Sequence, residues 1–62
     1  MKVAQIIALL EKHGWVLSRQ KGSHRQFKHT ENPNVITVPG NLSDDIPKGT
    51  EHQILKKSWL KK

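Results

Sequence analysis

One histidine, His24, lies in a sequence setting where an imidazole can do chemistry. An imidazole takes up and gives back a proton near neutral pH, so it can act as a general acid or base. Its neighbours combine cations with a glycine-containing turn: Lys21, Gly22, Ser23, Arg25 and Lys28. Cations hold phosphate groups, and the backbone N–H groups of a Gly-Ser turn can bind a phosphate oxygen. These residues predict a site that binds or acts on a phosphate-bearing chain.

RNA is a chain that such a site could cleave without a metal ion. Each scissile phosphate of RNA has an adjacent 2′-hydroxyl that serves as the nucleophile. A positioned base, a proton donor and cations near the developing phosphorane charge are then sufficient. A lone surface histidine with no catalytic role is the simpler reading of the same residues, and chemistry alone leaves both open.

Other uses of the histidines have less support. The chain has four of them, His13, His24, His29 and His52. None has an i, i+4 histidine partner on a predicted helix or a carboxylate at ligand spacing, so we expect no metal site and no cofactor. A Ser-His-Asp hydrolase is not indicated, because Ser23 is adjacent to His24 and the aspartates are confined to positions 44 and 45. The absence of cysteine excludes thiolate zinc sites and cysteine nucleophiles and is compatible with a cytoplasmic protein.

Length and charge point to a basic working surface. The 62 residues carry 11 Lys and Arg against 5 Asp and Glu, a formal net charge of +6. This length predicts a single domain, residues 1–62, that is too small to enclose a large substrate pocket. No acidic residue occurs between positions 12 and 28 or after Glu51. The basic residues that cluster in these acid-free stretches attract phosphate backbones, although ordinary solvated lysines and arginines are an alternative.

No membrane segment is expected. No apolar run approaches the roughly 18 residues that a membrane span needs, and the N-terminus lacks a signal-peptide pattern. Binding of a membrane surface by the last helix is weakly supported, because its apolar face is short.

Two helices and three strands are predicted to position the basic residues. Apolar residues at i, i+3, i+4 and i+7 from Val3 predict a helix over residues 2–13, which Gly14 ends. Strands are expected over residues 15–20, 24–29 and 35–38, separated by turns. Thr50 and Gln53 resemble a capping box that opens a final helix through about residue 60. The cations expected near its end are Lys56, Lys57, Lys61 and Lys62.

Alternation along the second strand divides its side chains between two faces. Phe27 is its only large apolar residue and should face the core, together with Arg25 and His29. His24, Gln26 and Lys28 should then face solvent.

The order of elements predicts an α+β fold, α-β-β-β-α, with a three-stranded antiparallel sheet and both helices on one face. The uncovered face is the expected working surface. Apolar residues expected inside are Trp15, Ile46, Ile54, Leu55 and Trp59. Trp15 and Trp59 could instead stack on bases, but with three aromatic residues in the chain a core role is favoured.

The chain resembles the HicA toxins of bacterial and archaeal toxin–antitoxin pairs over nearly its whole length. The residues that carry the resemblance are Gly14-Trp15, Lys21-Gly22-Ser23-His24, Phe27, Val38-Pro39, Ile46-Pro47-Lys48-Gly49-Thr50 and Ile54-Leu55-Lys56. The resemblance implies a double-stranded-RNA-binding-domain-like fold and metal-independent cleavage of mRNA, with His24 as the essential residue and Gly22 as the motif glycine. It also implies neutralisation by a HicB antitoxin.

Three departures from the family pattern are visible. Many members have a second histidine after the Val-Pro, where this chain has Gly40-Asn41. That change argues against a two-histidine relay and leaves water, the leaving group, Lys21 or Lys28 for the second acid/base role. Glu51 replaces a commonly apolar residue, and Ser58-Trp59 replaces a small Ala-Gly pair, which suggests altered packing or antitoxin contact.

The leading hypothesis is therefore a toxin endoribonuclease that acts on mRNA. His24 would be the general acid/base, and the RNA would be held by Lys21, Gly22, Ser23, Arg25 and Lys28. The alternative is a non-catalytic RNA- or DNA-binding module that uses the same basic face. A domain whose only ligand is a protein is a third possibility.

Overall fold

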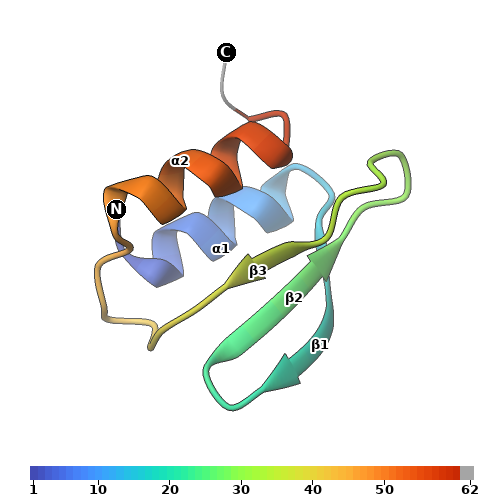
Figure 1. The fold of residues 1–62 in the computed structure, drawn as a ribbon. Helices are drawn as coiled ribbons and strands as arrows, with labels where there is room; N and C mark the ends of the chain where they lie inside the picture. The colour runs from blue at the N-terminus through green and yellow to red at the C-terminus, as the bar shows by residue number, and fades with distance from the viewer. Residues whose placement is uncertain (61–62) are drawn as a thin grey trace.

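The computed structural model describes residues 1–60, and Lys61 and Lys62 lie outside this part. The elements are α1 (Val3–Lys12), β1 (Val16–Lys21), β2 (His24–Lys28), β3 (Ile36–Val38) and α2 (Lys48–Lys57). The strands form one antiparallel sheet in the order β1-β2-β3, and both helices lie on one of its faces (Figure 1). The predicted α-β-β-β-α fold is confirmed. Within residues 1–60, neither helix has the length and apolar character needed to cross a membrane.

The first helix begins and ends where the sequence predicts, to within one residue. Its first free N–H groups are bonded by the loop before α2: Val3 N–H donates to the Asp44 carbonyl at 2.9 Å and Ala4 N–H to the Leu42 carbonyl at 3.1 Å. At the other end Gly14 has φ +91°, the left-handed conformation that terminates helices. The two hydrogen bonds from the loop before α2 fix the N-terminal end of α1, and Gly14 sets its C-terminal end.

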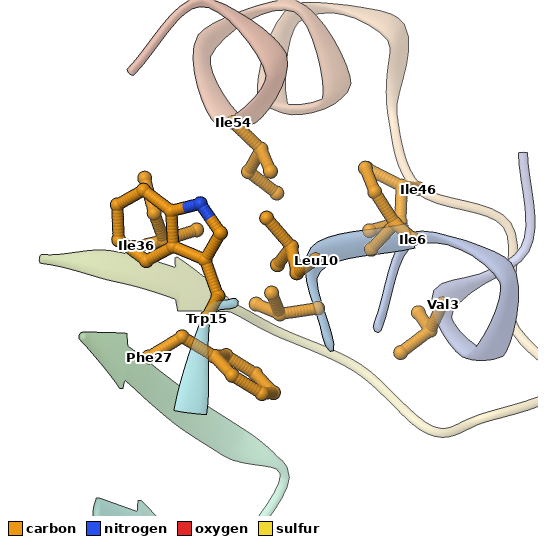
Figure 2. Packing of buried hydrophobic residues seen from close by; sticks show 9 residues of the cluster. Val3, Ile6, Leu10, Trp15, Phe27, Ile36, Ile46 and Ile54 are labelled. Atoms are coloured by element: carbon orange, nitrogen blue, oxygen red, sulfur yellow. The ribbon is translucent and has the colours of Figure 1, made fainter. Parts of the chain in front are cut away.

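The core lies between the helices and the sheet. In Figure 2, Ile54 of α2 points toward Leu10 of α1, and Phe27 of β2 and Trp15, which directly precedes β1, approach from the side of the sheet. The buried apolar residues are Val3, Ile6, Leu10, Trp15, Phe27, Ile36, Val38, Ile46 and Ile54. The burial of Ile46, Trp15 and Phe27 confirms three expectations from the sequence. Leu55 is partly buried against this cluster.

The predicted start of the second helix is wrong. The helix begins at Lys48, and the Thr50–Gln53 pair that resembles a capping box lies inside it. Pro47 precedes the first helical residue with φ −56° and ψ 142°. The first N–H groups of a helix have no partner within the helix, so a proline at this boundary removes no needed hydrogen bond. Proline therefore marks the boundary that the threonine was expected to mark.

The expected burial of Trp59 is also wrong, because the helix ends at Lys57 rather than near residue 60. Leu60 N–H donates to the Leu55 carbonyl at 3.1 Å and Trp59 N–H to the Lys56 carbonyl at 3.3 Å, the two bonds of a Schellman motif. Trp59 occupies its left-handed position with φ 65°, where glycine is usual, and is 60% exposed. Because the chain reverses after α2, the Trp59 indole does not lie on the buried face of the helix. It lies beside the His29 ring, with the ring centroids 6.4 Å apart.

Candidate nucleic-acid interface

A two-residue turn brings the first site residues together. Gly22 and Ser23 connect β1 to β2, and Lys21 and His24 are directly paired across the turn. Gly22 has φ +57°, whereas Ser23 is not among the residues with positive φ, which is the pattern of a II′ turn. A Cβ at position 22 would meet nothing within 4 Å, so backbone conformation rather than space calls for glycine here.

A β-bulge decides which face the β1 cations occupy. Leu17 pairs with Phe27, but Arg19 pairs with Gln26, so Ser18 is an extra residue in β1. Without it, strict alternation from Leu17 would turn Arg19 and Lys21 toward the helices. The bulge reverses the phase of β1, and both cations lie on the same face of the sheet as His24.

The uncovered face of the sheet therefore carries two rows of polar residues. Lys21 and His24 form the row next to the turn. Arg19, Gln26 and Thr37, one residue from each strand, form the next row, because Gln26 pairs with both of the others. We call this second row the Arg19–Gln26–Thr37 row. An open hollow of about 780 Å³ covers both rows and is lined by Arg19, Lys21, Gly22, Ser23, His24, Gln26 and Thr37.

The imidazole of His24 is exposed, and among residues 1–60 no hydrogen bond or ion pair engages it. The exposed ring is thus open to a ligand in the hollow that it lines. This exposure agrees with the alternation of β2, in which Phe27 is buried and Lys28 is exposed.

The charges of the site have no protein counterions within the described residues. Two ion pairs are present there, from the N-terminal amine to Glu51 and from Lys2 to Asp45, each at 3.3 Å. Both lie at the beginning of α1, away from the hairpin. Glu51 and Asp45 are therefore engaged at the N-terminus, and no described ion pair neutralises the hairpin cations, which can attract an anionic ligand.

Two predicted phosphate-binding residues lie away from the hollow. Arg25 pairs with the buried Val38 on the covered side of the sheet, and its Nη1 donates to the carbonyls of Ser23 at 3.1 Å and Gly40 at 2.9 Å. Lys28 is exposed at the far end of β2, opposite Val16. Four strand-rise steps separate it from His24, about 13 Å.

Three residues of the hollow were not among the residues singled out in the sequence as contacts: Arg19, Gln26 and Thr37. The outward position of Gln26 followed from alternation, and Arg19 belongs to the acid-free stretch. Only the register across the three strands shows that these side chains form one row. In the part of the chain that the structure describes, no group of three or more His, Cys, Asp or Glu residues is placed to hold a metal ion.

Comparison with known families identifies a match over nearly the whole chain. The family described as HicA toxin of bacterial toxin–antitoxin matches residues 3–60 of the 62-residue chain. A comparison with curated proteins returns no match.

Proposed function

Because the chain belongs to the HicA toxin family, we propose that it is an endoribonuclease that cleaves mRNA without a metal ion, with His24 as the general acid/base. One observation carries the proposal. An exposed imidazole without a protein partner in residues 1–60 lies directly opposite Lys21 on the uncovered face of the sheet. Proton transfer and charge stabilisation are thus available at one place on an open surface.

The proposed reaction uses the nucleophile that RNA carries. His24 takes the proton from a 2′-hydroxyl, the O2′–P bond forms, and the bond from phosphorus to the 5′-oxygen breaks. The leaving oxygen takes a proton from water or from a nearby lysine ammonium. The products are a 2′,3′-cyclic phosphate and a free 5′-hydroxyl, so no bound metal is needed to generate the nucleophile.

The residues around His24 have separate roles in this proposal. Lys21 and the N–H groups of the Gly22-Ser23 turn stabilise the charge on the phosphate. Lys28 contacts a phosphate farther along the strand. Arg25 holds the turn by donating to the Ser23 carbonyl. Because Arg25 also donates to the Gly40 carbonyl, a phosphate that binds Arg25 would approach from the edge of the sheet near Gly40.

A HicB-like antitoxin is the proposed partner. An acidic protein surface that covered the uncovered face would neutralise the hairpin cations and block His24 together. Binding to the folded state would also stabilise a domain this small. The proposed location is the cytoplasm, where mRNA is translated.

The test is cleavage of a single-stranded RNA by the purified chain in the presence of EDTA. We expect cleavage to continue, to leave 2′,3′-cyclic phosphate ends, and to fall by about 10²-fold or more in His24→Ala. His52→Ala, which changes a histidine of α2, is the matched control and should retain activity. Complete inhibition by EDTA, or unchanged cleavage by His24→Ala, would contradict the proposal.

The second candidate function is a non-catalytic RNA- or DNA-binding module. It is favoured by the replacement of the family's second histidine with Gly40-Asn41, which leaves His24 as the sole imidazole lining the hollow in residues 1–60. This function predicts binding that weakens steeply with salt and RNA that is never shortened.

A further inference from the structure

We propose that the Arg19–Gln26–Thr37 row binds one base of single-stranded RNA and reads its identity, beside the phosphate that His24 attacks. This inference rests on the proposed function and extends it from cleavage to sequence preference. Its basis is the register that places one polar side chain from each strand in the same hollow as His24.

The dimensions of the row suit a nucleotide. Neighbouring strands lie about 4.8 Å apart, so the row spans about 10 Å across the sheet. His24 is two residues from Gln26 along β2, about 7 Å. A base lying over the row would therefore leave its own phosphate near Lys21 and His24.

The chemistry of the row suits a base edge. The Gln26 amide offers a donor and an acceptor side by side, and the Thr37 hydroxyl offers both as well. Single-stranded RNA is read mainly through hydrogen bonds to exposed base edges and through stacking. Arg19 supplies a planar guanidinium on which a base can stack.

An aromatic platform is not available for this purpose. Of the three aromatic residues, Trp15 and Phe27 are buried, and Trp59 lies beside His29, a residue of the covered side. Arg25 is held on that side by the Gly40 carbonyl. Among the residues lining the hollow, Arg19 is therefore the one side chain with a flat surface that also carries a permanent charge.

The three side chains are free to bind. Across the described chain, none of them makes a side-chain hydrogen bond or an ion pair, in contrast to the fully bonded His29 and the anchored Arg25. The bulge at Ser18 interrupts the ladder between β1 and β2, yet it alone brings Arg19 into the row. Bulges commonly re-aim side chains next to active sites.

The experiment is to map cleavage positions on an RNA pool of random sequence. Wild-type protein should favour one base at a fixed position next to the cut, and Gln26→Ala should reduce that preference by about 5-fold to 100-fold. Thr37→Val, which keeps the shape and suits a strand, should weaken it less. Gln53→Ala removes an amide from α2 and is the matched control. An identical base preference in wild type and Gln26→Ala would overturn the inference even if cleavage is intact.

Binding of non-cleavable RNA separates this inference from the proposed function. The probes are 2′-O-methyl tetranucleotides that differ at a single base, titrated into the His24→Ala protein. Base-dependent affinity that disappears when Gln26→Ala is added supports the row, even for a chain that never cleaves RNA. Equal affinity for all probes, with dependence on salt alone, would reject the row whether or not wild-type protein is a nuclease.

Discussion

Two histidines at opposite ends of β2 have opposite environments. His29, just after the strand, uses both ring nitrogens: Nδ1 accepts the Glu31 N–H at 3.0 Å, and Nε2 contacts the His13 carbonyl at 3.1 Å. Its ring also lies 5.2 Å from that of Trp15. His24, at the turn end, has no such partner within residues 1–60.

The difference separates a structural imidazole from one available for chemistry. A backbone N–H donates to Nδ1 of His29, so the proton must be on Nε2, where it is donated to a carbonyl. That ring joins the end of α1 to the end of β2. His24 makes no comparable connection within residues 1–60, so its ring remains open to a ligand.

The sharpest test of this comparison is the stability of two alanine variants. His29→Ala removes two hydrogen bonds and the ring contacts with Trp15 and Trp59, and should lower the free energy of unfolding by about 1–3 kcal/mol. His24→Ala should stay within about 0.5 kcal/mol of wild type, as exposed substitutions usually do. Urea denaturation of both variants measures the difference. Equal losses of stability would show that His24 also has a structural role.

A second test concerns the turn that presents His24. Gly22→Ala puts a side chain at φ +57° and should cost about 1–2 kcal/mol of stability. Cleavage should fall too, because the turn sets the pairing of Lys21 with His24. Gly49→Ala, at a helical glycine with open space around its Cβ position, is the control and should not destabilise the protein. Equal thermal unfolding of the two variants would count against a conformational requirement at Gly22.

The smallest expected effect is on the salt dependence of RNA binding, compared between a lysine on the uncovered face of the sheet and a lysine on α2. Lys28→Ala removes one proposed phosphate contact from the uncovered face and should reduce the slope of log affinity against log salt by about 0.7. Lys56→Ala removes a cation from α2 on the covered side and should leave that slope unchanged. Titrations of RNA at several salt concentrations give both slopes. If Lys56→Ala changed the salt slope more than Lys28→Ala did, the result would indicate that RNA binds on the helices and not on the uncovered face of the sheet.

Most elements of the fold were predictable from the sequence because their signals are local. The apolar spacing from Val3 gave α1, Gly14 gave its end, and alternation around Phe27 placed His24 outward. The errors also have local causes. The start of α2 depends on Pro47 rather than Thr50, and the exposure of Trp59 results from a Schellman turn formed without glycine.

The sequence by itself determined the basic hairpin, the glycine turn and the exposed imidazole of His24, because each depends on residues within a few positions of one another. Only the tertiary structure decided that Arg19 and Lys21 share the face of His24 and that Thr37 completes a row with Gln26. The physical reason is register. A single extra residue, Ser18, exchanges the faces of every later side chain in β1, and no local pattern fixes which residue of β3 pairs with β2.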